Sequence, residues 1–326
     1  MPMLVKKEMV AKVLTMKDVV NIMETTFRFH GQGKVEQPPK SYLIFQHGDM
    51  RSMPSHINAP TMDIAGIKCV TVHPNNRKLG LPTVMATILL IDPKTGYNIA
   101  VMDGTLITDM RTGAAGALAA KYLSKKDSKV AGFIGAGRQA YTQMEALMVV
   151  RKLKLVKIYD LNLKTAQDFA KWINKKYPAV KAVIVKTVNE AAIECDILTT
   201  TTPSRAPVVM AKDVSPGTHI NAIGADAPGK QELDEALIKK CTIVIDEWEQ
   251  TSHSGEINVP FAKGVITKKD VHAELGKVVA KLQKGRTNDN QITVFDSTGL
   301  ACQDIATAYN VYKKLKSKKI ADVKFI

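Results

Sequence analysis

The sequence predicts an α/β protein whose larger part is a doubly wound parallel sheet. Between residues 129 and 245, short runs suited to strands are apolar along their whole length, and amphipathic runs suited to helices alternate with them. Strands that are apolar throughout, rather than at every second residue, are typical of a parallel sheet covered on both faces. Alternating strands and helices build a sheet of this kind.

The first third of the chain predicts a mixed α+β region. Thr15 and Asp18 have the spacing of a capping box, and they open an amphipathic helix that ends near Gly31 and Gly33. Short apolar and β-branched runs then predict strands at 41–45, 67–72 and 83–91, because proline and glycine separate them.

The rest of the chain predicts the elements of the parallel sheet in order. The expected strands are 130–134, 156–159, 182–185, 197–200, 219–223 and 242–245. The expected helices run from about 138 to 150 and over 165–175, 189–193 and 232–239. A helix over 271–282, a strand at 292–295 and a final helix over 301–315 complete the prediction.

Length and composition limit the classes of protein. A chain of 326 residues with 45% hydrophobic residues is long enough for two domains and a sizeable core. No apolar run reaches the roughly 18 residues of a membrane span, and the N-terminus lacks the apolar core of a signal peptide. We therefore expect no membrane association and a cytoplasmic protein.

The positive charge and the cysteines favour ordinary structural roles. The net charge of +15 comes from lysines scattered in twos and threes, and only residues 313–319 are densely basic. Because no aromatic residues interleave with them, we expect solvated surface charge and no nucleic-acid partner. The four cysteines lie far apart without a C-x-x-C pair, which predicts buried, reduced thiols and no metal site.

A glycine-rich turn is the strongest local motif. Gly135-Ala136-Gly137-Arg138-Gln139-Ala140 follows the apolar run 130–134 and opens a predicted helix. In this context a G-x-G-x-x-A motif predicts a Rossmann-type dinucleotide site. The first glycine permits the turn, the second lets the backbone approach a pyrophosphate, and the alanine lets the helix pack on the strand. Free N–H groups at the helix N-terminus favour the phosphates there.

An acid follows the next predicted strand. Asp160 lies where a carboxylate would accept hydrogen bonds from both ribose hydroxyls and would repel a 2′-phosphate. This position predicts NAD rather than NADP as the cofactor. A helix N-cap or a solvated aspartate is the alternative interpretation, and the nearby Lys164 leaves the strictness of the preference open.

Several other polar residues stand in apolar or glycine-rich surroundings. Thr201 and Thr202 follow a strand whose carboxyl end would face the cofactor, although a β-branched strand running into a turn also explains them. Singly, each of the remaining candidates is better explained by a structural salt bridge or an exposed face. These candidates are Arg51 before Met53-Pro54, Lys68 in an apolar strand, Arg111 before a Thr-Gly-Ala segment and Asp226 after the strand 219–223.

Together with a dinucleotide site, the four candidates form a coherent set. Hydride transfer to or from a small acid needs a clamp for a carboxylate, a cation that polarises a C=O or C=N bond, and a group that moves protons. Arginine suits the clamp because it bonds a carboxylate bidentately. Lysine suits the polarising cation, and an aspartate in a cleft suits general acid–base chemistry.

Over nearly its whole length the sequence resembles the ornithine cyclodeaminase/μ-crystallin family, and most of all its archaeal alanine dehydrogenase branch. The matching motifs are Pro38-Pro39-Lys40, Arg51-Ser52-Met53-Pro54, Gly66-Ile67-Lys68, His73-Pro74-Asn75, Gly80-Leu81-Pro82-Thr83, Arg111-Thr112-Gly113-Ala114, the glycine-rich turn, Thr202-Pro203-Ser204, the segment from His219 to Asp226, Pro228-Gly229-Lys230-Gln231-Glu232-Leu233, Gly255-Glu256-Ile257 and Phe295-Asp296-Ser297-Thr298-Gly299-Leu300.

This resemblance implies a homodimer in which a Rossmann NAD-binding domain, residues 113–299, is inserted into a substrate-binding and dimerisation domain of residues 1–112 and 300–326. It implies catalytic roles for Lys68 and Asp226 and substrate binding by Arg51, Lys40 and Arg111. In addition to the six residues of the glycine-rich turn and Asp160, the cofactor contacts expected are Thr112, Thr201, Thr202, Ile223, Gly224, Lys230, Asp296, Ser297 and Thr298.

One position distinguishes activities within the family. Before the Met-Pro pair, cyclodeaminases carry a glutamate that suits the distal ammonium of ornithine, whereas this chain has Arg51. An arginine repels that ammonium and attracts a carboxylate. The resemblance therefore implies NAD-dependent conversion of L-alanine to pyruvate and ammonium, and the reverse reductive amination. Ornithine cyclodeamination, a related ketimine or amino-acid reduction, and a non-catalytic binding role like that of μ-crystallin are the alternatives.

Overall fold

The chain forms two compact units, which a computed structural model describes over residues 2–318. One unit contains Met1–Arg111 and Leu300–Ile326, and the other contains Thr112–Gly299. Residues 319–326, which we assigned to the substrate-binding domain, lie outside the described residues. The boundary between the units falls within helix α3 (Thr105–Leu123), so the chain passes from one unit to the other inside a helix.

The first unit is built on a seven-stranded sheet of order β1-β7-β6-β5-β4-β2, in which β3 also pairs with β4. Only β1 and β7 are parallel among these pairs of described strands. The strands are β1 (Met3–Val5), β2 (Val35–Glu36), β3 (Ser41–Phe45), β4 (Gly48–Ala59), β5 (Met62–Val72), β6 (Val84–Ile91) and β7 (Asn98–Asp103).

The predicted strands of the first unit are confirmed, but four of its strands were not predicted. The runs 41–45, 67–72 and 83–91 correspond to β3, part of β5 and β6. Strand β4 escaped prediction because buried Arg51 and Ser55 interrupt the apolar residues on its inward face. Strand β7 and the short strands β1 and β2 were also not predicted.

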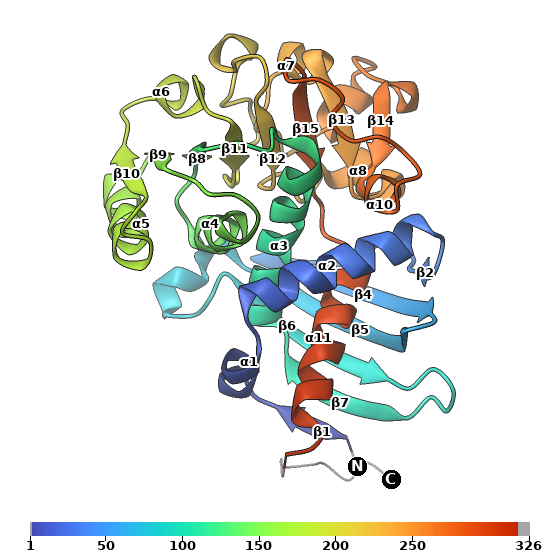
Figure 1. Ribbon diagram of the computed structural model, residues 1–326. Helices are drawn as coiled ribbons and strands as arrows, with labels where there is room; N and C mark the ends of the chain where they lie inside the picture. Colours follow the sequence, from blue (N-terminus) through green and yellow to red (C-terminus); the bar gives the residue numbers. More distant parts are fainter. Residues whose placement is uncertain (1, 319–326) are drawn as a thin grey trace. The chain divides into compact units, whose positions relative to one another are not determined.

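Besides the first part of α3, the first unit contains helices α1 (Lys7–Val13), α2 (Met16–Gly31) and α11 (Ala301–Leu315). Helix α11 packs on β4, β5 and β6, and α2 packs on α11 (Figure 1). Thr15 caps α2 as predicted, because its Oγ1 accepts a hydrogen bond from the Asp18 N–H. The bounds of α11 are those predicted from the sequence.

The second unit contains an eight-stranded sheet in which every described pair of strands is parallel. Its order is β10-β9-β8-β11-β12-β15-β13-β14, so the first five strands have the doubly wound order of a Rossmann sheet. The predicted fold class is confirmed. The strands are β8 (Val130–Ile134), β9 (Leu155–Tyr159), β10 (Lys181–Ile184), β11 (Ile197–Thr200), β12 (His219–Ala222), β13 (Cys241–Ile245), β14 (Val271–Glu274) and β15 (Ile292–Asp296).

Helices pack against this sheet and bury two hydrophobic clusters. One cluster contains Phe133 of β8 and Phe169 of α5, and the other contains Ile220 of β12 and Leu237 of α7. The helices after α3 are α4 (Arg138–Val150), α5 (Leu163–Lys176), α6 (Val188–Ala192), α7 (Glu235–Lys240), α8 (Trp248–Ser254), α9 (Asn258–Ala262) and α10 (Leu275–Val279). Short 3-10 turns lie at Pro74–Leu79, Ala211–Asp213 and Lys268–Asp270.

One element of the second unit was predicted wrongly. The run 271–282 was expected to form a single helix, but its first four residues form β14 and only Leu275–Val279 is helical. Pairing with β13 decides the conformation of this short edge segment, and local amphipathicity does not report such pairing.

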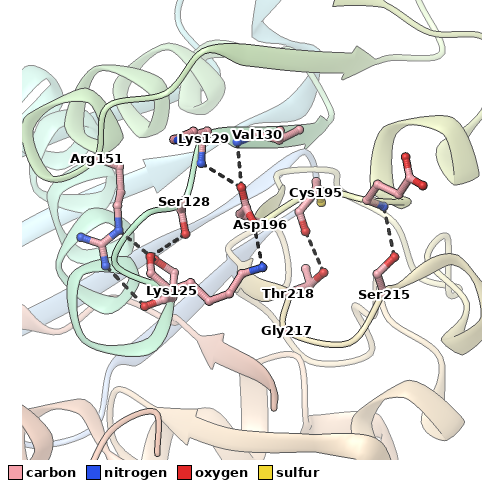
Figure 2. Close-up of polar contacts among 12 residues, drawn as sticks. Lys125, Ser128, Lys129, Val130, Arg151, Cys195, Asp196, Ser215, Gly217 and Thr218 are labelled. Atoms are coloured by element: carbon pink, nitrogen blue, oxygen red, sulfur yellow. Dashed lines mark hydrogen bonds and ion pairs between the residues drawn. The ribbon is translucent and has the colours of Figure 1, made fainter. Parts of the chain in front are cut away.

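Polar contacts fix the amino ends of the central strands (Figure 2). The carboxylate of Asp196 accepts hydrogen bonds from the N–H groups of Lys129 and Val130 and pairs with Lys125. Thr218 donates to the carbonyl of Cys195. These contacts hold the starts of β8, β11 and β12 together, at the end of the sheet opposite the one that carries the glycine-rich turn.

Residues 2–318 lack two features, a membrane-spanning helix and a cluster of metal ligands. Within them, no helix is long and apolar enough to cross a membrane. The same residues contain no cluster of three or more His, Cys, Asp or Glu side chains suited to a metal ion.

All four cysteines are free, but only Cys195 and Cys302 are buried. Cys69 is exposed, contrary to the expectation of buried thiols.

Candidate functional site

The glycine-rich turn connects β8 to α4 with the backbone geometry that the motif predicts. Gly135 has a φ of +90°, and a Cβ there would lie 2.9 Å from Oγ1 of Thr201, so both conformation and space require glycine. Gly137 is the N-cap of α4 without a side-chain cap, and a Cβ there would meet no heavy atom within 4 Å. Ala140 is fully buried, which lets α4 pack closely on the sheet. The turn therefore offers open space next to the N-terminal amides of a 13-residue helix.

Asp160 lies beside this turn. Its Oδ2 accepts a hydrogen bond of 2.8 Å from the Ala136 N–H, and its Oδ1 accepts one of 2.8 Å from the Asn162 N–H. Asn162, not Asp160, is the N-cap of α5, which removes one alternative interpretation of Asp160. Lys164 pairs with Asp168. The structure thus brings together the two parts of the predicted dinucleotide site.

A buried carboxylate that we did not predict joins the carboxyl ends of β11 and β12. Glu232 accepts hydrogen bonds from Thr200 Oγ1 at 2.7 Å, from the Thr202 N–H at 2.6 Å and from the Gly224 N–H at 2.9 Å. Thr201 donates to the carbonyl of Gly135 at 3.0 Å. The expected cofactor residues at these strand ends are therefore held in fixed positions around the turn.

A second buried carboxylate supports Glu232. Glu256 accepts hydrogen bonds from the backbone N–H groups of Glu232 and Leu233, at 2.8 and 2.6 Å. Burial raises the pKa of Glu256 well above its usual value, and the negative charges of Glu232 and Asp296 raise it further. Burial also raises the pKa of Glu232, although its hydrogen bonds oppose this effect.

Asp226 and Lys230 form an ion pair in the loop after β12. Oδ1 of Asp226 lies 2.6 Å from Nζ of Lys230, and both side chains are partly exposed. Asn258 holds this loop, because it accepts a hydrogen bond from the Gly229 N–H and donates to the Lys230 carbonyl. Asp226 is thus presented at the same end of the sheet as the glycine-rich turn.

The expected residues after β15 make internal contacts. Oδ2 of Asp296 accepts a hydrogen bond from the Ile257 N–H at 2.9 Å, and Ser297 is buried. Thr298 donates to Asp246, a residue that we did not predict. Asp246 directly follows the apolar strand β13, as Asp160 follows β9. A search for an acid after a predicted strand would therefore have found Asp246 too.

The remaining expected cofactor residues lie at three places: just after β12, on α4 and on α3. Ile223 is buried, and its N–H bonds to the Thr200 carbonyl. Arg138 and Gln139 form the first turn of α4. Thr112 lies on α3, where its carbonyl accepts a hydrogen bond from Nε2 of Gln143.

In the first unit, strand pairing places Arg51 and Lys68 on one buried face. Met53 is the register partner of Lys68, and Arg51 is the partner of Val70, so these side chains share the face that α11 covers. Arg51 pairs with Asp49, with Nε 2.7 Å from Oδ1, and its guanidinium lies 5.3 Å from the ring centroid of Tyr42.

A buried ionic cluster forms around Asp304 of α11. Its Oδ2 lies 2.6 Å from Nζ of Lys68, and its Oδ1 lies 3.1 Å from Nε of Arg111. Gln303 Oε1 accepts a hydrogen bond of 2.8 Å from Nη1 of Arg111. Thr108 Oγ1 lies 3.4 Å from Oδ1 of Asp304. We did not predict Asp304 or Gln303. The available signal was an acid among the apolar residues on the inward face of a predicted helix.

The surroundings of Lys68 change its acidity. Burial lowers its pKa to about 7 with the help of the nearby cations Arg111 and Lys40, although Asp304 opposes the shift. Lys40, which we expected to bind the substrate, therefore lies near enough to act electrostatically on Lys68. The cluster contains the lysine and one arginine of the predicted set, while Asp226 belongs to the second unit.

The second unit has the features that a dinucleotide requires. Gly137 leaves open space at a helix N-terminus, and Asp160 carries acceptors beside the turn. These groups match the pyrophosphate and the ribose hydroxyls of NAD. The donor set of the site therefore fits this cofactor.

Comparisons with known proteins identify the family. Residues 1–319 match the sequence profile described as "Ornithine cyclodeaminase/mu-crystallin family". The chain is 50% identical over 324 residues to an alanine dehydrogenase of Archaeoglobus fulgidus, covering 99% of this chain and 98% of that protein. It is 32% identical over 313 residues to a Delta(1)-pyrroline-2-carboxylate reductase of Bacillus cereus, covering 95% of this chain and 96% of that protein.

Solved structures show the same likeness. An archaeal alanine dehydrogenase dimer with bound NAD superposes with a TM-score of 0.95 at 49% identity, covering 100% of this chain and 99% of that one. A Thermococcus litoralis Delta(1)-pyrroline-2-carboxylate reductase in complex with NADH and L-proline gives a TM-score of 0.94 at 39% identity, covering 98% and 100%.

Proposed function

The chain belongs to the ornithine cyclodeaminase/mu-crystallin family, and from this premise we propose that it is an NAD-dependent dehydrogenase that interconverts L-alanine with pyruvate and ammonium. The observation that carries the proposal is the buried cluster of Lys68, Arg111 and Asp304, which holds two cations against one anion. Such a cluster suits a substrate with one carboxylate. Likeness to alanine dehydrogenases at about half identity supports the choice of substrate.

The second unit would hold NAD through the glycine-rich turn and Asp160. The amides at the start of α4 would bind the pyrophosphate, and Asp160 would exchange its bond to the Ala136 N–H for bonds to the ribose hydroxyls. Bound NAD supplies the hydride acceptor. Glu232 would keep the strand ends that carry Thr201, Thr202 and Gly224 in place.

The cations of the first unit would bind and polarise the substrate. Arg111 would bind the carboxylate, and the Lys68 ammonium would stabilise the negative charge that develops on oxygen as pyruvate forms. Asp226 would accept a proton from the water that attacks the imine carbon and would return a proton to the departing ammonia. The Lys230 ammonium, 2.6 Å from Oδ1, would hold the Asp226 carboxylate in place for this transfer.

Arg51 distinguishes this proposal from ornithine cyclodeamination. The acid nearest in sequence to Arg51, Asp49, is paired with its guanidinium, so Asp49 is not available for the distal ammonium of ornithine. The buried face therefore offers that ammonium a positive charge rather than a free carboxylate. Ornithine should bind poorly for this reason.

Reduction of a cyclic imine is the second candidate function. The likeness to the reductase in complex with NADH and L-proline favours it, since that chain is matched almost completely. Delta(1)-pyrroline-2-carboxylate also carries one carboxylate, so the cationic cluster would suit it too. The two functions differ in whether the enzyme releases ammonium.

We also propose that the protein is a homodimer. All five residues of β3 are exposed, including Leu43 at 54% and Ile44 at 73%, and a strand with this composition is unusual on a free surface. The dimeric state of the archaeal alanine dehydrogenase supports this assignment.

A substrate screen tests the proposed function. Purified protein is mixed with NAD and with L-alanine, L-proline or L-ornithine between pH 7 and pH 10, and NADH, ammonium and proline are measured. We expect NADH and ammonium from L-alanine. NADH from L-proline alone would favour the reductase, and proline from ornithine without net NADH would favour the cyclodeaminase.

A variant links the turnover to the assigned site. Asp226→Asn should lower alanine turnover by about 100- to 10,000-fold while NADH fluorescence shows unchanged cofactor binding. Asp168→Asn, which changes an exposed acid of the same unit, is the control. Full turnover in Asp226→Asn would contradict its role in proton transfer.

A further inference from the structure

Three buried side chains around Asp304 retain hydrogen-bond donors without an acceptor among residues 2–318. Lys68 donates one of its three N–H groups, to Asp304. Arg111 donates through Nε to Asp304 and through Nη1 to Gln303, which leaves Nη2 without a protein acceptor in this part of the chain. Gln303 accepts from Arg111 through Oε1, so its Nε2 must be the donor end, and this atom is buried without a partner.

A buried donor without an acceptor, such as Nε2 of Gln303, is costly unless a ligand or water supplies an oxygen atom. The donors here come from three residues, and each residue is held by Asp304 either directly or through Arg111. The cluster therefore consists of several hydrogen-bond donors that are held in place by one carboxylate, that of Asp304. A small acid with a carboxylate and a keto oxygen offers the matching acceptors.

We propose that Asp304 is a positioning residue, which fixes Lys68 and Arg111 in one hydrogen-bonded cluster, favours the ammonium form of Lys68, and turns the remaining donors of both cations toward the substrate. This inference rests on the proposed function for the identity of the substrate. The effect of Asp304 on the charge of Lys68 does not depend on it.

The charged groups that act on Lys68 explain why Asp304 has this effect. Arg111 from α3 and Lys40, which precedes β3, are cations, whereas Asp304 from α11 is an anion. The register partners of Lys68 on the two neighbouring strands are Met53 and Ile88, which are apolar. Loss of the Asp304 charge would leave Lys68 buried among cations, and it would then release its proton at lower pH.

The first measurement is the pH dependence of unfolding in urea, which needs no substrate. Between the folded pKa of Lys68 and its unfolded pKa, the unfolded chain holds one more proton at this residue, so stability rises with pH. Lys68→Met lacks this rise, and subtracting its stability from that of the unmodified protein isolates the contribution of Lys68.

Asp304→Asn, compared with Asp304→Asn/Lys68→Met, should begin this rise at a pH lower by about one to three units. Asp18→Asn, which disrupts the Asp18–Lys314 ion pair of the same unit, should leave the onset unchanged. An unchanged onset in Asp304→Asn would overturn the proposal.

The second measurement is the binding of oxamate, a non-reactive analogue of pyruvate, to the protein saturated with NADH. Asp304→Glu keeps the negative charge but displaces it, and it also serves if Asp304→Asn does not fold. We expect Asp304→Glu to keep the onset of the stability rise and to bind oxamate at least about tenfold more weakly, with NADH binding unchanged.

Oxamate binding to Asp304→Glu that equals that of the unmodified protein would contradict the positioning role. Failure of the unmodified protein to bind oxamate would instead contradict the proposed function. The urea measurement would still decide whether Asp304 controls the charge of Lys68.

Discussion

The carboxylate of Asp160 accepts a hydrogen bond of 2.8 Å from the backbone N–H of Ala136, in the middle of the glycine-rich turn. The two residues are 24 positions apart in the chain, on the loops that follow β8 and β9. Because these strands are parallel neighbours, their carboxyl ends meet at one edge of the sheet. In the proposed mode of NAD binding, this acid would contact the adenosine ribose.

Removing the charge of Asp160 should change the cofactor preference. In Asp160→Ser the ribose hydroxyls lose an ionised acceptor, and a 2′-phosphate is no longer repelled. We expect kcat/KM for NAD to fall by about tenfold or more, and the ratio of NADP to NAD use to rise. Steady-state kinetics with both cofactors measure this ratio, with Asp168→Ser as the control. An unchanged ratio would show that Asp160 does not contact the ribose.

The two glycines of the turn should respond differently to alanine. Gly135→Ala forces a side chain into a φ of +90° and against Thr201, so it should lower the free energy of unfolding by about 1–3 kcal/mol. Gly137→Ala meets open space and should cost at most about 1 kcal/mol through the poorer N-cap.

Gly137→Ala should affect cofactor binding more than stability. A methyl group at Gly137 would occupy the space where the pyrophosphate approaches the backbone, so Gly137→Ala should weaken NADH binding with little loss of stability. Urea unfolding and fluorescence titration with NADH measure the two effects. Normal NADH affinity in Gly137→Ala would place the pyrophosphate elsewhere.

Glu256 should make stability depend on pH. Its pKa is raised in the folded protein, so between the unfolded and folded values the folded chain holds the extra proton, and stability falls as pH rises. This contribution is fully present below about pH 4.5, the unfolded value. Glu256→Gln keeps the shape without the charge. We expect the unmodified protein to lose more than about 1 kcal/mol relative to Glu256→Gln between pH 5 and pH 8 in urea unfolding. A constant difference would contradict the raised pKa.

Strand β3 should be part of the dimer contact. Ile44→Glu places a charge on a strand whose five residues are all exposed in the single chain. We expect sedimentation velocity to show dissociation toward monomer at concentrations where the unmodified protein is dimeric. Leu282→Glu, at a comparably exposed leucine of the second unit, is the control and should remain dimeric. Identical sedimentation of both variants would exclude β3 from the interface.

Much of the second unit could be predicted because its signals are local. Its central strands are largely apolar and buried, and Gly135 and Asp160 each follow a strand directly, so spacing alone located them. The segment that forms β14 was predicted to be helical because its conformation depends on pairing with β13 rather than on its own pattern. Strand β4 was not predicted because Arg51 faces inward, at a position where the alternating pattern of a strand requires an apolar residue.

By itself the sequence determined the fold class, the dinucleotide turn and the family. The fold class and the turn depend on residues close together in the chain, where backbone geometry and periodicity act, and the family depends on the order of short motifs along it. Only the tertiary structure showed that Lys68 and Arg111 share Asp304, which is 236 positions from Lys68, and that Glu232 joins two strand ends. A buried charge requires a partner wherever the fold can supply one, and no local pattern specifies which distant residue that partner is.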